Sequence, residues 1–185
     1  MRIAVCVKWV PAISRLRFDT ETKRIVREGV PNEINPHDVL AMNRALDLRR
    51  QHGGNVTAFT MGPPDARRAL ARCLAMGVDA VYHLNDIAFA GSDTLATARA
   101  LSLALARERF DLILFGNSSV DAETGQVGPE VAEMLDLPQI TGVYKFDLSG
   151  TTVHAERVLE NGIEVVEAST PLVVCVGEGI ASDVG

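Results

Sequence analysis

Short apolar runs alternate with helical patterns along most of the chain. Largely apolar runs are typical of strands covered on both faces, and they predict strands at residues 3–7, 56–61, 80–84 and 111–115. Apolar positions at helical spacing predict helices at residues 36–52, 63–76, 92–107 and 123–135. Strands that alternate with helices in this way indicate βαβ crossovers. We therefore expect an α/β fold of the doubly wound, three-layer, Rossmann-like type around a parallel sheet.

In the last part of the chain, the predicted strands follow one another without helices between them. Three further strands are predicted at residues 143–148, 151–159 and 163–168. The segment between the second and third contains Asn161-Gly162, a signature of a tight hairpin, so these strands should form an antiparallel meander. One more apolar strand is predicted at residues 171–177. We expect one domain over residues 1–185, with a parallel core at 1–140 and an antiparallel extension at 141–177.

Composition narrows the class of protein. A formal net charge of −6, with scattered Lys and Arg, argues against nucleic-acid binding, which relies on clustered basic residues. Cys6, Cys73 and Cys175 form no CxxC pair, which predicts buried thiols in a reducing compartment such as the cytoplasm. No apolar run approaches the roughly 18 residues of a membrane span, so we expect no membrane insertion.

The richest candidate site follows the predicted strand at residues 111–115. Gly116 leaves backbone room for a ligand, and Asn117, Ser118 and Ser119 supply hydrogen-bonding side chains. The segment continues into a helix, whose free amides and positive dipole end suit a phosphate. Asp121 and Glu123 would repel a phosphate that they faced, and they would then bind ribose hydroxyls or cap the helix. An ordinary strand-loop-helix connection has the same pattern, and neither a P-loop nor a GxGxxG fingerprint is present.

No catalytic centre can be read from the spacing of the residues. The four histidines have no partners in a pattern typical of hydrolysis or group transfer, and Cys6 has no His or Asp at readable spacing. Trp9 could stack on a base or cover the sheet edge, and the sequence leaves both roles open. We therefore expect a binding protein rather than an enzyme.

Read in order, these segments resemble the beta subunit of the electron-transfer flavoproteins. The resemblance spans nearly the whole chain and includes residues 5–11, 34–38, 60–63, 71–79, 111–116, 121–133 and 137–139. It implies a non-catalytic electron carrier made with an alpha-type subunit, and electron exchange with a dehydrogenase or quinone reductase. This chain would bind a second adenine nucleotide, AMP or FAD, while the redox-active FAD would be held mainly by the alpha subunit.

The resemblance also implies which residues contact that nucleotide. These cofactor-binding residues are Cys6, Asn35, Pro36, His37, Asp38, Met61, Gly116, Asn117, Ser118, Ser119, Val120, Asp121, Ala122, Glu123, Thr124, Gly125, Gln126 and Val127. The pattern at residues 121–128 is closer to the electron-bifurcating and nitrogen-fixation-associated members than to the mitochondrial type.

The sequence departs from the family pattern in three places. His37 stands where Phe is usual, and Trp9 stands where a polar residue is common. Full-length beta subunits carry a further C-terminal segment, with the dehydrogenase-recognition loop and an arm around alpha, so we expect a shortened form of the subunit. A stand-alone nucleotide-sensing domain of the universal-stress type, forming a homodimer without alpha, is the alternative. An adenylating or hydrolysing enzyme ranks last.

Overall fold

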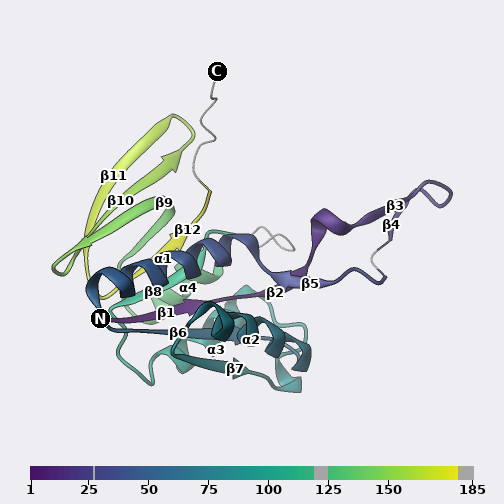
Figure 1. The fold of residues 1–185 in the computed structure, drawn as a ribbon, viewed down its shortest axis with the longest axis horizontal. Coiled ribbons are helices and arrows are strands. Elements are labelled where there is room, and N and C mark those ends of the chain that lie inside the picture. Colours follow the sequence, from purple (N-terminus) through teal and green to yellow (C-terminus); the bar gives the residue numbers. More distant parts are fainter. Residues whose placement is uncertain (27, 119–124, 179–185) are drawn as a thin grey trace.

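The computed structural model describes residues 1–26, 28–118 and 125–178. Its centre is an eight-stranded sheet in the order β11-β10-β9-β12-β8-β1-β6-β7 (Figure 1). Neighbouring strands from β9 to β7 are all parallel, whereas β10 is antiparallel to both β9 and β11. The strands are β1 (Arg2–Cys6), β6 (Asn55–Met61), β7 (Ala80–Leu84), β8 (Leu112–Gly116), β9 (Gln139–Ser149), β10 (Thr152–Leu159), β11 (Gly162–Ser169) and β12 (Leu172–Val176).

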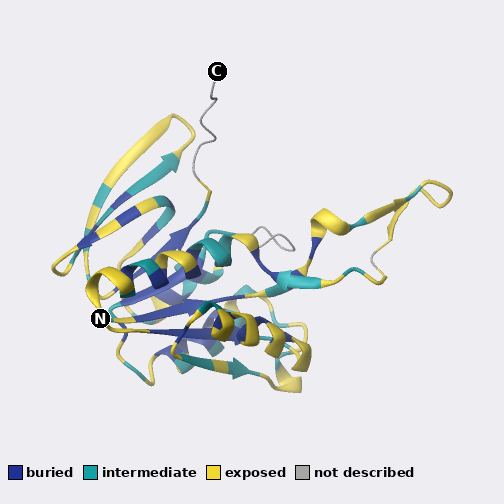
Figure 2. Cartoon of the chain, in the orientation of Figure 1, coloured by how far each residue is buried: buried dark blue, intermediate teal, exposed yellow. Residues whose placement is uncertain are grey.

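Helices cover both faces of this sheet. They are α1 (Pro36–His52), α2 (Arg67–Met76), α3 (Thr94–Leu105) and α4 (Val127–Met134). Side chains of a strand alternate between its faces, so Ile3 and Val5 pack with α1 and α2, whereas Ala4 and Cys6 pack with α3 and α4. Figure 2 shows the buried strands between helices whose outer surfaces are exposed. The expected doubly wound α/β fold with three layers is confirmed.

The predicted helix starts are corrected at two places. Pro63 was expected to begin a helix, but a short 3₁₀ turn, η2 (Pro64–Ala66), precedes α2. Residue 123 was expected to begin another, but α4 begins at Val127. Gly125 has φ +59°, in the left-handed region that glycine favours, so the chain at this position is still a loop.

The meander is continuous with the parallel part of the sheet. β9 pairs in parallel with β12, which lies between β9 and β8, and β10 and β11 then extend the sheet to its edge. The boundary expected at residues 140 and 141 therefore falls inside β9. The expected hairpin at Asn161-Gly162 is present, since Leu159 faces Gly162 across β10 and β11.

An arm of residues 9–26 and 28–34 projects from the body of the molecule (Figure 1). It contains two antiparallel ribbons, a 3₁₀ turn and a cross-strand pair of Phe18 with Ile25, both exposed. The sequence predicted only a polar connection here, because strands of three residues are too short to show alternation. The elements are β2 (Trp9–Pro11), η1 (Ile13–Arg15), β3 (Arg17–Asp19), β4 (Arg24–Val26) and β5 (Asn32–Ile34).

Candidate functional site

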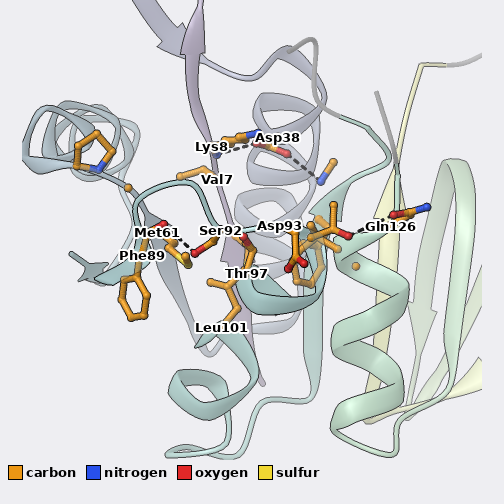
Figure 3. Close-up of a pocket in the computed structure, with 18 of the residues that line it drawn as sticks. Val7, Lys8, Asp38, Met61, Phe89, Ser92, Asp93, Thr97, Leu101 and Gln126 are labelled. Carbon is orange, nitrogen blue, oxygen red and sulfur yellow. Dashed lines mark hydrogen bonds between the residues drawn. The ribbon is translucent and has the colours of Figure 1, made fainter. Parts of the chain in front are cut away.

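A cavity of about 1180 Å³ opens at the carboxyl ends of β1, β6, β7 and β8 (Figure 3). The chain lays down β1, β6 and β7 toward one edge of the sheet, and then crosses back to place β8 on the other side of β1. The strand order therefore reverses between β1 and β8. In open α/β sheets, this point is where ligands bind, because the loops after the two strands diverge.

Half of the expected contact residues line this cavity. They are Cys6, Asp38, Met61, Gly116, Asn117, Ser118, Gly125, Gln126 and Val127. Residues 119–124, which the sequence also placed in the site, lie outside the described residues. Asn35, Pro36 and His37 are described, and they are not among the residues that line the cavity.

Asn35 and His37 instead lie behind the wall formed by Ser118. The Asn35 side chain is 1% exposed and donates from Nδ2 to the backbone oxygen of Ser118 at 2.8 Å. His37 Nδ1 lies 3.4 Å from Ser118 Oγ. Pro36 is the first residue of α1, where its missing N–H costs no helical hydrogen bond. These residues support the wall of the cavity from the side of α1.

Asp38 joins two strand ends through its carboxylate. Oδ2 accepts from the amide of Lys8 at 2.8 Å, and Oδ1 accepts from the amide of Gly116 at 3.0 Å (Figure 3). The residue is 6% exposed. Burial raises the pKa of Asp38 to about 7, while the hydrogen bonds from Lys8, Asn35 and Gly116 and the Lys8 charge act in the opposite direction.

Gly116 leaves room for Asp38. A Cβ at residue 116 would lie 2.2 Å from Asp38 Oδ1, and it would also meet the backbone of His37 and Asp38 at 2.9 and 2.8 Å. Only a residue without a side chain fits there. The sequence assigned this glycine to the approach of a ligand, whereas the closest atoms belong to the protein itself.

Gly128 has a related role where α4 crosses the sheet. A Cβ at this position would lie 2.5 Å from the Cys175 sulfur on β12. The missing side chain therefore lets the first turn of α4, beside the cavity, pack closely on the sheet.

We predict that Gly128→Ala destabilises the protein by about 1–3 kcal/mol, because overpacking outweighs the better helix propensity of alanine. The same substitution should cost less in a Cys175→Ala background, where the overlapping sulfur is gone. Urea denaturation of the two single variants and the double variant gives the coupling energy. Additive effects would contradict this explanation.

The cysteines and Trp9 are the other residues that the sequence singled out. All three cysteines are free and buried, as expected, and burial raises the pKa of the Cys6 thiol above its ordinary range. Trp9 is not among the described cavity-lining residues. Its Nε1 donates to Asp65 at 2.9 Å, and the Arg72 guanidinium lies 5.2 Å from its ring centre. Of the two roles left open, base stacking therefore receives no support.

One wall of the cavity was missed by the sequence analysis. It is formed by the segment after β7 and the first turns of α3, and its lining residues include Phe89, Ser92, Asp93, Thr97 and Leu101 (Figure 3). Asp93 caps α3 by accepting from Ala96 at 2.8 Å. Thr94 Oγ1 lies 3.2 Å from Gln126 Oε1, which joins this wall to the start of α4. The sequence holds a signal for this wall, because the predicted strand at residues 80–84 ends at the same edge of the sheet as the other parallel strands.

The lining of the cavity combines a few polar groups with a large apolar surface. Among the described residues, no three His, Cys, Asp or Glu side chains are grouped to hold a metal ion. The lining offers backbone amides, hydroxyls and amide side chains beside a large apolar surface from Met61, Phe89, Leu101 and Phe115. Such a mixture is typical of cofactor sites, where a few polar groups orient a mostly buried ligand.

Comparison with known proteins identifies the family of this chain. Residues 22–183 match the model of the electron transfer flavoprotein domain. The chain belongs to the electron transfer flavoprotein family. The electron transfer flavoprotein subunit beta of Thermoanaerobacterium thermosaccharolyticum is 46% identical over 94% of this chain and 67% of its own length. Protein FixA of Azorhizobium caulinodans is 43% identical over 94% of this chain and 65% of its own length.

A third relative is named as part of a larger assembly. The caffeyl-CoA reductase-Etf complex subunit CarD of Acetobacterium woodii is 40% identical over 96% of this chain and 69% of its own length. The chain thus spans about two thirds of the length of these relatives. The resemblance to electron transfer flavoprotein beta subunits is confirmed, and with it a carrier subunit rather than an enzyme. Within the described ranges, no helix is long and apolar enough to cross a bilayer.

Proposed function

We propose that this chain is the nucleotide-binding, beta-type subunit of an electron carrier, and that its cavity holds an adenine nucleotide, AMP or FAD. The observation that carries this proposal is the position of the cavity at the reversal of strand order between β1 and β8. Family membership supplies the electron-transfer role.

The polar groups suit the phosphate end of a nucleotide. Gly116, Gly125 and Gly128 line the space, and α4 begins at the same end of the sheet. Helix N-termini attract phosphates through unpaired N–H groups and the helix dipole. We infer that the phosphate lies near Gly125–Val127, and that the ribose and base extend along the strand ends.

The size of the cavity favours FAD over AMP. At about 1180 Å³, it exceeds the roughly 300–1,000 Å³ typical of small-molecule sites. The wall formed by Phe89, Ser92 and Leu101 adds space beyond the loop that begins at Gly116 (Figure 3). A single mononucleotide would leave this wall bare, whereas the second half of a dinucleotide would cover it.

The partner in this proposal is an alpha-type subunit that holds the redox-active FAD. The relative from Acetobacterium is named as a subunit of a complex. The relative from Thermoanaerobacterium is named as an electron transfer flavoprotein subunit beta, and the relative from Azorhizobium is named FixA. We infer that a dehydrogenase or quinone reductase exchanges electrons with the assembled carrier. The three free thiols support a reducing, cytoplasmic setting.

The ligand can be identified directly from purified protein. Gentle denaturation should release AMP or FAD, recognised by its mass and, for FAD, by its absorption spectrum. Added nucleotide at 100 times its Kd should stabilise the protein by about 2.7 kcal/mol, and a chain of this size should then melt roughly 5–10 °C higher. GMP serves as the control ligand. If no adenine nucleotide is released and neither AMP nor FAD raises the melting temperature, the proposal fails.

Co-expression with an alpha-type subunit tests whether that subunit is the partner of this chain. A stable complex with an alpha-type subunit in size-exclusion chromatography supports a carrier subunit. A homodimer that binds ATP and ignores alpha would instead support the universal-stress-like alternative.

A further inference from the structure

We propose that Asp38 is a positioning residue whose carboxylate clamps the two diverging strand ends on which the nucleotide site is built. This role rests on the proposed nucleotide site and gives it a specific support. The family resemblance assigned Asp38 to the ligand itself, whereas its oxygens are directed at backbone amides of the protein (Figure 3).

The clamp lies just beyond the point where the pairing between β1 and β8 ends. β1 and β8 pair in parallel from Ile3 with Leu112 to Cys6 with Phe115, and the register ends there. Beyond it, one oxygen of Asp38 accepts from Lys8 on the β1 side, and the other accepts from Gly116 on the β8 side. One side chain therefore replaces the missing ladder bonds at the mouth of the cavity.

The clamp itself is held in place from α1. The amide of Asp38 donates to Asn35 O at 2.9 Å, and the amide of Asn35 donates to Lys8 O at 2.9 Å. Asn35 Nδ2 then reaches Ser118 O at 2.8 Å. These bonds tie the start of α1 to the loops after both strands. Displacing the carboxylate should therefore loosen the cavity wall at Gly116 and Ser118 together.

The surroundings favour a structural use of the charge. Among the described residues, the titratable groups around Asp38 are Lys8 and Cys6 after and on β1, Cys73 on α2, Cys175 on β12 and His37 on α1 itself. The carboxylate accepts from amides with both oxygens, and it would repel the phosphate of a nucleotide. It is thus better placed to hold the backbone than to recognise the ligand.

The test compares Asp38→Asn with Asp79→Asn. Asparagine keeps the shape of aspartate but has one acceptor oxygen, so its NH₂ group must face either the Lys8 or the Gly116 amide. The unmade bond should weaken AMP or FAD binding by about tenfold to a hundredfold in isothermal titration. Asp79 also accepts from a backbone amide, that of Val56 at 2.8 Å, but it lies at the opposite end of the sheet. Asp79→Asn should lower the melting temperature and leave the nucleotide Kd unchanged.

A second measurement begins with the wild-type protein. Because one carboxylate accepts from both amides, the amide proton shifts of Lys8 and Gly116 should titrate with a single midpoint in the wild-type protein without ligand. Asp38→Asn should remove that midpoint, whereas His37→Asn should keep it.

The outcomes separate this inference from the proposed function. Separate midpoints for the two amides, or an Asp38→Asn variant that binds nucleotide within twofold of wild type, would overturn the clamp. A wild-type protein that binds no adenine nucleotide overturns the proposed function, and the amide titration then still decides whether Asp38 bridges the strands.

Discussion

Replacing Phe59 with alanine should lower the free energy of unfolding by about 3–5 kcal/mol, the range for a buried Phe. Phe59 lies on β6, is 2% exposed and packs with Ala98, Leu101 and Leu105 of α3. Its ring lies 5.2 Å from that of Tyr82 and meets that of Phe110 edge-on at 5.7 Å. The truncation therefore opens a void directly beneath the cavity wall that Leu101 helps to form.

Urea denaturation measures this loss, which is a large share of the roughly 5–15 kcal/mol of a typical domain. Phe18→Ala on the arm is the matched control, because this side chain is 62% exposed and its removal should change stability by no more than about 0.5 kcal/mol. Similar losses for the two variants would show that the packing beneath the cavity is not as described. Nucleotide binding by Phe59→Ala should weaken as well, since Leu101 loses its support.

Replacing Gly116 with alanine should cost at least the roughly 1–3 kcal/mol of an overpacked core and should also abolish tight nucleotide binding. The new Cβ would overlap Asp38 Oδ1 and the backbone of His37 and Asp38, which belong to the rigid start of α1. Since backbone cannot turn aside as a flexible side chain can, either α1 or the end of β8 must move. The carboxylate would then lose the Gly116 amide.

Gly150→Ala is the control for the effect of adding a methyl group to a glycine. Residue 150 has φ +61°, so alanine is strained there by about 1–2 kcal/mol, but no atom lies within 4 Å of the new Cβ. Both variants should melt at lower temperature, and only Gly116→Ala should lose affinity for AMP or FAD. If Gly150→Ala lost affinity to the same extent, destabilisation alone would account for the effect at Gly116.

The strands and helices of the body could be predicted because burial leaves a simple pattern of apolar positions. β1, β6 and β8 are largely buried, β7 is an edge strand of intermediate burial, and each was located to within one residue. The arm could not be predicted in this way. Its strands are only three residues long, and β3 and β4 are mostly exposed, so no apolar period marks them.

The candidate site could be predicted in part for a related reason. Residues that follow a buried strand, such as Met61 and Gly116, can be placed at one sheet edge once the strands are known. The role of Asp38 depends on Gly116, 78 positions away in the chain, and on Lys8, 30 positions away. No local pattern encodes such a bridge. The wall around Phe89 comes from the segment after β7, the edge strand of the sheet, and no glycine-rich motif directly after that strand marks it as part of a site.

The continuous sheet has a consequence for how this protein can change. Five strand spacings separate β11 from β1, which at about 4.8 Å each amounts to roughly 24 Å. Substitutions at sites separated by more than about 7–10 Å usually have additive effects on stability. Substitutions of the exposed side chains of β11, such as Ile163 and Val165, should therefore change stability additively with substitutions on β1 beside the cavity, although both strands belong to one sheet.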